Sequence, residues 1–144
     1  MTEQDMMIVS QLREDQKLAF IKAFAKLAAR DGKIDDDERE FIKGMALTYG
    51  VPAARIDEIW EQGDDAELLA ELKEIKNRKA ALMLIKEMCI LANADEDLSD
   101  NEVLFIGQVG EAMGVEMSKI QEISNWVLER LIWLEKGRLI FEEV

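Results

Sequence analysis

Apolar residues recur three and four positions apart along most of the chain, and this spacing is typical of helices. Between residues 15 and 30 they form two adjacent stripes, which together make a wider apolar face than a surface helix carries. We therefore expect this helix at the centre of the fold. Its stripes comprise Leu18, Phe20, Ile21, Phe24, Ala25, Leu27 and Ala28.

The same spacing predicts helices on both sides of this central one. Good helix formers fill most of the sequence, and Pro52, the single proline, stands where a helix can begin. Gly50 is expected to end the preceding helix in a left-handed conformation. We predict an all-α fold, a compact bundle of about 7–8 helices. The predicted helices cover about 5–13, 15–30, 35–49, 52–61, 65–75, 79–93 and 117–136. Another predicted helix contains Gly107 and Gly110. The helix at 65–75 could also continue through 76–79 into the next one.

The two halves of the chain resemble each other. When the sequence is shifted by 64 residues, 14 of the 40 positions in 20–59 are identical to their counterparts in 84–123. This indicates an internal duplication, with one repeat at about 15–61, the other at about 79–126, and a C-terminal helical extension to residue 144. We expect a single domain over 1–144 in which the repeats pack across a pseudo-two-fold axis, where helices 15–30 and 79–93 meet.

Composition narrows the classes of function. Lys and Arg total 18 against 31 Asp and Glu, and the formal charge of -13 repels nucleic acids and anionic lipids and favours cations or basic partners. Histidine is absent and Cys89 is the only cysteine, which excludes metal sites built from Cys and His and leaves hard cations that bind oxygen. No organic cofactor is indicated. The N-terminus lacks a secretory pattern and no apolar run approaches about 20 residues, so we expect a cytoplasmic protein that is not itself transmembrane.

Two acidic loops occupy equivalent places in the repeats. Asp35 with Glu38, and Ser99 with Glu102, have the spacing of a capping box, which explains both glutamates without any ligand. Asp31 and Asp95 are different, because each follows the C-terminal end of a helix, where the helix dipole opposes a carboxylate. Asp31-Gly32 is also an ordinary turn pair, but the second repeat has Glu96 in place of Gly32 and keeps the aspartate.

The first loop matches only the second half of an EF-hand calcium loop. Leu27 and Ala29, and in the repeat Leu91 and Asn93, occupy the first and third ligand positions, so a normal EF-hand is excluded. If the pseudo-two-fold brings the loops together, four carboxylates could instead bind one divalent cation: calcium, magnesium or manganese. These four are Asp31, Glu38, Asp95 and Glu102.

Both acidic motifs follow an apolar helix that ends in Leu-Ala-x-x-Asp, and with Asp-Gly-x-Ile-x-x-x-Glu and Asp-x-x-Leu-x-x-x-Glu the chain resembles the TerB-like family of tellurite-resistance proteins over about 15–126. The resemblance implies a compact helical domain with an acidic site at Asp31, Glu38, Asp95 and Glu102. It also implies a role in bacterial resistance to tellurite and other stress, through metal binding or assembly with other stress-response proteins at the inner membrane surface. Glu96 departs from the pattern, since the first motif has Gly32 there.

Three functions follow from these features. The first is a non-enzymatic stress-response domain whose duplicated acidic loops bind a divalent cation. The second is a metal-independent interaction module that turns its acidic face toward a basic partner. The third, a carboxylate-based metalloenzyme, ranks lowest because no nucleophile, histidine base or phosphate-binding loop accompanies the acids.

The C-terminal helix carries apolar residues on two faces, with Trp126 and Trp133 seven positions apart. We favour the interpretation that both tryptophans cover the bundle, with 139–141 as a terminal flap over the same surface; a partner protein is the alternative. Gly44, Gly107 and Gly110 are expected at close helix contacts, with a homo-oligomer that uses Gly107 and Gly110 as the alternative, and Cys89 is expected in the core.

Overall fold

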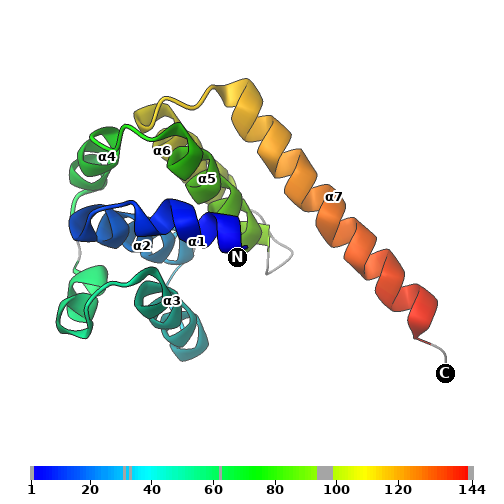
Figure 1. Ribbon diagram of the computed structural model, residues 1–144. Coiled ribbons are helices and arrows are strands. Elements are labelled where there is room, and N and C mark those ends of the chain that lie inside the picture. The colour runs from blue at the N-terminus through cyan, green and yellow to red at the C-terminus, as the bar shows by residue number, and fades with distance from the viewer. Residues whose placement is uncertain (1, 31, 33, 62, 94–98, 143–144) are drawn as a thin grey trace.

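The protein is an all-helical bundle in the computed structural model, which describes residues 2–30, 32, 34–61, 63–93 and 99–142 (Figure 1). Within those residues there are eight helices and no strand, as predicted. The helices are α1 (Glu3–Ser10), α2 (Glu14–Ala28), α3 (Asp36–Tyr49), the 3-10 helix η1 (Ala53–Trp60), α4 (Asp65–Lys73), α5 (Arg78–Asn93), α6 (Asp100–Ala112) and α7 (Met117–Phe141).

The helix boundaries follow from local capping. Thr2 accepts a hydrogen bond from the amide of Asp5, whose side chain accepts one from Thr2 in return, so α1 begins earlier than the predicted residue 5. Gly50 has a φ of 90° and ends α3 in the left-handed conformation that the sequence predicted. Asn77 accepts a hydrogen bond from the amide of Ala80, which starts α5 afresh. The suggested continuous helix through 76–79 is therefore wrong.

The core lies between α2 and α5, which pack against each other as predicted. Helix α2 also packs on α3, η1 and α4, and α5 also packs on α1, α6 and α7. Burial of the wide apolar faces of these two helices is the main stabilising contribution of the fold. Their large side chains with at most 1 % exposure are Phe20, Ile21, Phe24, Leu27, Leu84, Ile85 and Met88.

Helix positions recur along the chain at the interval of 64 residues. Shifted by that interval, α2 falls on 78–92, where α5 begins at Arg78, and α3 falls on 100–113, where α6 begins at Asp100. The start of η1 at Ala53 likewise falls on Met117, where α7 begins. The order of helices from α2 to η1 is therefore like that from α5 to α7, with one difference: η1 is a short 3-10 helix and α7 a long α-helix.

Helices α1 and α4 each pack against helices from both halves of the chain. Helix α1 packs on α3 of its own half and on α5, the central helix of the other half. Helix α4 packs on α6 of its own half and on α2 of the other. This reciprocal packing extends the correspondence to α1 and α4, which the alignment did not reach. A pseudo-two-fold relation between the halves stays a prediction.

On α3, Ile42 takes the core position and the neighbouring Phe41 is 58 % exposed. Three expectations about apolar residues and glycines are wrong. The segment 139–141 is no flap, because α7 continues through Gly137 to Phe141. Trp126 and Trp133 do not cover the bundle, since they are 52 % and 72 % exposed. A Cβ on Gly44 would meet no atom within 4 Å, so that glycine makes no close helix contact.

The expectation holds for Gly110, where a Cβ would lie 2.3 Å from Cδ1 of Ile120 on α7. At Gly107 a Cβ would make an ordinary contact of 3.6 Å with Met117. Cys89 is buried at 2 % exposure, as predicted, and burial raises the pKa of its thiol to about 11, against a smaller lowering by a hydrogen bond with Ser124.

Candidate functional site

The two glutamates of the predicted acidic site lie in the first turns of α3 and α6. Glu38 is half-buried and Glu102 is buried, with 9 % exposure. Asp31 and Asp95, the two aspartates on which the cation hypothesis depends most, lie outside the described residues.

Both glutamates form the capping boxes that the sequence predicted. The amide of Glu38 donates to Oδ1 of Asp35 at 2.7 Å, and the amide of Asp35 donates to Oε1 of Glu38 at 3.4 Å. In the second half, the amide of Glu102 donates to Oγ of Ser99 at 3.2 Å, and the amide of Ser99 donates to Oε1 of Glu102 at 3.2 Å. Each glutamate thus satisfies a backbone donor at a helix start and has a structural role that needs no cation.

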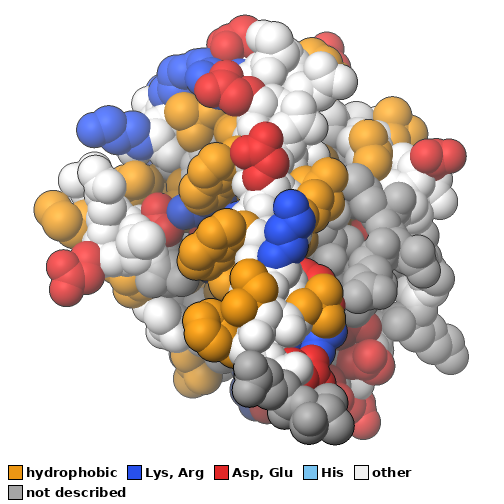
Figure 2. Space-filling view, turned by 90° about the vertical axis from the view of Figure 1, so that its right-hand side faces the viewer, with side chains coloured by type: hydrophobic (Ala, Val, Ile, Leu, Met, Phe, Trp, Pro, Cys, Tyr) orange, Lys and Arg blue, Asp and Glu red, His pale blue; other side chains and the backbone are white. Residues whose placement is uncertain are grey.

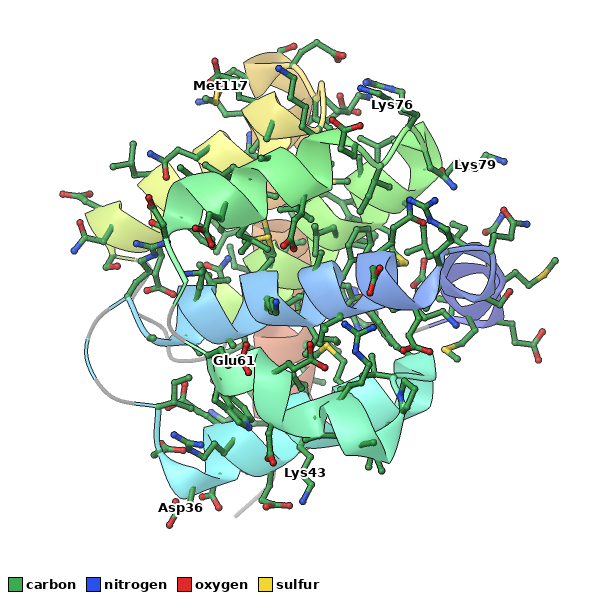
Figure 3. All side chains as sticks on the ribbon, turned by 90° about the vertical axis from the view of Figure 1, so that its left-hand side faces the viewer. Asp36, Lys43, Glu61, Lys76, Lys79 and Met117 are labelled. Carbon is green, nitrogen blue, oxygen red and sulfur yellow. The ribbon has the colours of Figure 1, made fainter. Side chains whose placement is uncertain are left out.

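Among the residues that the structure describes, no three side chains of the types His, Cys, Asp and Glu come together as a metal ion requires. A shared site would need Asp31 and Asp95 in addition to the two glutamates, and it stays a prediction. The acidic residue Asp36 points outward at the start of α3, at the opposite end of the molecule from Met117 (Figure 3).

A hollow of about 240 Å³ beside the first acidic loop is lined by basic side chains that the sequence reading missed. Arg30 and Lys26 both bind the carboxylate of Asp65, at 2.7 Å and 3.2 Å. Burial raises the pKa of Asp65, but the two cations lower it by more, so the net pKa lies below the ordinary value. Arg30 also stacks on Phe105, with 4.0 Å between guanidinium carbon and ring centroid.

These contacts tie the end of α2 to the start of α4 and to α6. The nitrogen of Lys26 also donates to the carbonyl of Gly63 at 2.6 Å, and Arg39 stacks on Trp60 at 4.7 Å. The cations lining this hollow therefore serve contacts within the protein. Residues at the end of one helix and the start of another, 35 positions apart, give no recognisable spacing in the sequence, which is why the pairing of Arg30 with Asp65 escaped prediction.

The largest unexplained feature is the apolar surface of α7. The outer part of this helix projects away from the bundle (Figure 1), and apolar side chains gather along it on the face seen in Figure 2. Only Ile120 and Val127 are buried among the residues of α7. We call the exposed set the α7 apolar surface. It comprises Trp126, Leu128, Ile132, Trp133, Leu134, Leu139, Ile140 and Phe141, which are 47 % to 87 % exposed.

The size of this surface is unusual for a monomer. Large apolar side chains exposed to this degree present roughly 100 to 200 Å² each, so the eight together present on the order of 1,000 Å². They are spread over two faces, because Leu128, Ile132 and Leu139 lie roughly 200–240° around the helix from Trp126. The stripe of Trp126, Trp133, Ile140 and Phe141 alone presents roughly 700 Å², against about 300–600 Å² for the largest apolar patch on a typical monomer. The sequence contains the signal, because apolar residues occupy more than one face of the last helix, but the same spacing also fits coverage of the core.

An apolar groove of about 550 Å³ lies at the inner end of this surface, between α1, α5 and α7. Its apolar lining comes from Ile8, Leu82, Met83, Ile123 and Trp126. The groove is therefore continuous with the α7 apolar surface through Trp126.

The corresponding hollow in the first half, between α2, η1 and α4, is lined by charges instead. There Arg55 binds Glu14, Asp15 and Glu58 at 2.7–2.9 Å. The two halves thus share a framework and differ in surface chemistry on this side.

Comparisons of the chain with protein-family models, with curated proteins and with solved structures found no match. Of the helices in the described ranges, none is both long and apolar enough to cross a membrane.

Proposed function

We propose that this chain is a non-enzymatic, TerB-like stress-response module that acts in the cytoplasm by binding other proteins through α7. The observation that carries the proposal is the α7 apolar surface. The projecting helix exposes about 1,000 Å² of apolar area to water. A partner that covers this area removes it from water, and that burial favours binding. Stress-response proteins at the inner membrane surface are the expected class of partner, by resemblance to the TerB-like family.

Electrostatics support a protein partner at this surface. Within 125–142, three acidic and three basic side chains balance, although the chain as a whole carries a charge of -13. A nearly neutral, apolar helix lets a partner approach where the repulsion from the rest of the protein is weakest. The excess of acidic residues elsewhere in the chain disfavours binding to nucleic acid.

Binding of a divalent cation is the second candidate function, and the recurrence of both aspartates favours it. Asp31 and Asp95 are kept in the two repeats although a helix end disfavours a carboxylate there. Glu38 and Glu102 would complete four carboxylates for calcium, magnesium or manganese. Because both glutamates already cap helices, the cation would have to share them with the backbone.

One cellular experiment separates these two functions. Bacteria expressing the chain would be grown on tellurite, with the wild type compared with a Trp133→Glu, Ile140→Glu variant and an Asp31→Asn, Asp95→Asn variant. We expect the α7 variant to lose protection and the aspartate variant to keep it. Asn125→Glu, a charge change at an exposed position of the same helix, serves as the matched control.

If the aspartate variant loses protection and the α7 variant keeps it, the result favours the cation site. If the wild-type protein gives no protection, the stress-response role is refuted. Calorimetric titration of calcium, magnesium and manganese provides the second readout. The cation function would be established if one of these metals gave heat of binding below millimolar concentration and if the aspartate variant gave none. A thermal midpoint that ignores all three metals would agree with the interaction module.

A further inference from the structure

We propose that the partner of the α7 apolar surface is a second copy of this chain, whose α7 crosses the first in antiparallel orientation near Trp133. This inference rests on the proposed function, in which α7 is the interaction surface, and it names the occupant. The stripe that would form the centre of the contact is Trp126, Trp133, Ile140 and Phe141.

The outer part of α7 is dispensable for closing the bundle. Its counterpart η1 ends at Trp60, which corresponds to Ser124, so residues 125–141 have no equivalent in the first half. Beyond Val127, only Leu131 of this segment packs against the core. These 17 residues form about 25 Å of helix. Most of that length makes its apolar surface available to another molecule.

The available area matches what a stable dimer requires. The four side chains of the central stripe are 52 % to 87 % exposed, which corresponds to roughly 700 Å². A standard protein interface buries about 800 Å² from each partner. A two-fold contact between identical stripes would therefore reach the usual size with little help from other elements.

Charge placement selects the antiparallel arrangement. When two α7 helices run antiparallel and cross at Trp133, Trp126 lies opposite Ile140 of the second copy, and Glu129 lies opposite its Gly137, one residue from its Lys136 on the same side of the stripe. The two-fold axis repeats both pairings. A parallel arrangement would instead place Glu129 opposite Glu129. Within the part of the chain that the structure covers, the ion pairs of α7 involve Lys119, Glu122, Glu135, Arg138 and Glu142, which leaves Glu129 and Lys136 available for this contact.

Gly137 fits the same crossing. A glycine inside an exposed helix costs about 1 kcal/mol relative to alanine. A Cβ at Gly137 would meet no atom within 4 Å, so packing within the chain does not require glycine there. In the antiparallel pair, Gly137 lies opposite Glu129 of the second copy and one residue from its Arg130, whose long side chain needs room beside the crossing point.

Sedimentation equilibrium over about 1–200 µM protein tests the pairing, because Kd values for interfaces of this size commonly lie in or below that range. We expect the wild type to be a dimer, and Trp133→Glu to raise Kd by at least a hundredfold with unchanged circular dichroism, since Trp133 is 72 % exposed and not needed for the fold. Asn125→Glu should remain dimeric. Wild type that stays monomeric, or a dimer that survives Trp133→Glu, would overturn the inference.

Charge reversal tests the orientation. Glu129→Lys and Lys136→Glu should each raise Kd by roughly fivefold, because each creates two like-charge contacts, and the double variant should restore the wild-type Kd. The two residues are seven positions apart on one helix, so they do not pair within a chain. Additive single effects would refute the antiparallel arrangement.

Failure here can be told apart from failure of the proposed function. A monomeric wild type that still needs Trp133 and Ile140 for growth on tellurite would keep the interaction module and remove only the second copy as its occupant. A monomer that sediments with phosphatidylglycerol vesicles through the same residues would identify a lipid surface as the occupant and overturn the inference.

Discussion

Replacing Gly110 with alanine should destabilise the protein, although alanine is the better helix former. Gly110 lies in α6 and is buried against α7. A Cβ there would lie 2.3 Å from Cδ1 and 3.1 Å from Cγ1 of Ile120. Rotation about χ2 can move Cδ1 away, but Cγ1 moves only with χ1, which is stiff in a β-branched residue on a helix. The added methyl group must therefore displace the side chain or the helix.

The expected magnitude is the difference between two opposing terms. Forcing one more methyl group into a packed core costs about 1–3 kcal/mol, and replacing a helical glycine by alanine returns about 1 kcal/mol. We expect Gly110→Ala to lower the free energy of unfolding by roughly 1 kcal/mol. Gly44→Ala is the matched control, because its Cβ enters open space on α3, and it should stabilise by about 0.5–1 kcal/mol.

Urea unfolding followed by circular dichroism measures both variants, and a double-mutant cycle locates the conflict. Ile120→Val removes Cδ1, the atom nearest the new methyl group, so its cost should be smaller in the Gly110→Ala background than in the wild type by about 0.5 kcal/mol or more. The reasoning fails if Gly110→Ala is as stable as Gly44→Ala, or if the two changes are additive.

Three further outcomes are expected. Gly50→Ala, at a φ of 90°, should lower the free energy of unfolding by about 1 kcal/mol in urea titrations, because alanine is strained in the left-handed conformation; an unchanged midpoint would contradict this. Burial raises the pKa of Asp5, but Lys86 at 2.7 Å and the Thr2 amide outweigh it, so the net pKa lies below 3.8. The stability from this carboxylate should thus be present above pH 4 and decline as pH falls through its folded pKa, and Asp5→Asn should show a shallower acid decline in thermal midpoint than the wild type. Cys89 should resist a thiol reagent at pH 8 in the native protein and react at once in urea, because it is buried with a pKa of about 11; rapid native labelling would contradict that placement.

The features that could be predicted from the sequence are those set by residues close together along the chain. The capping boxes at Asp35 and Ser99, the left-handed Gly50 and the wide apolar face of the helix at 15–30 all depend on residues within a few positions of one another. The pairing of the two central helices could also be predicted, because packing them together removes part of both wide apolar faces from water.

What the sequence did not determine depends on residues far apart. Apolar spacing on α7 is the same whether the covering surface belongs to this bundle or to another molecule, so the exposure of Trp133 could not be read from it. Arg30 and Asp65 meet only because the end of α2 packs beside the start of α4. The packing of α1 and α4 across the halves could not be read from the sequence, because α1 buries Asp5 and Val9 while α4 buries Leu68 and Leu72.

Because α1 packs on α5 and α4 packs on α2, the two halves of the chain depend on each other for folding. Cleavage near Gly63 would yield one fragment that keeps α1 but has lost α5, and another that keeps α4 but has lost α2. Neither fragment can bury its central helix alone, so two separately expressed fragments should assemble into one folded complex.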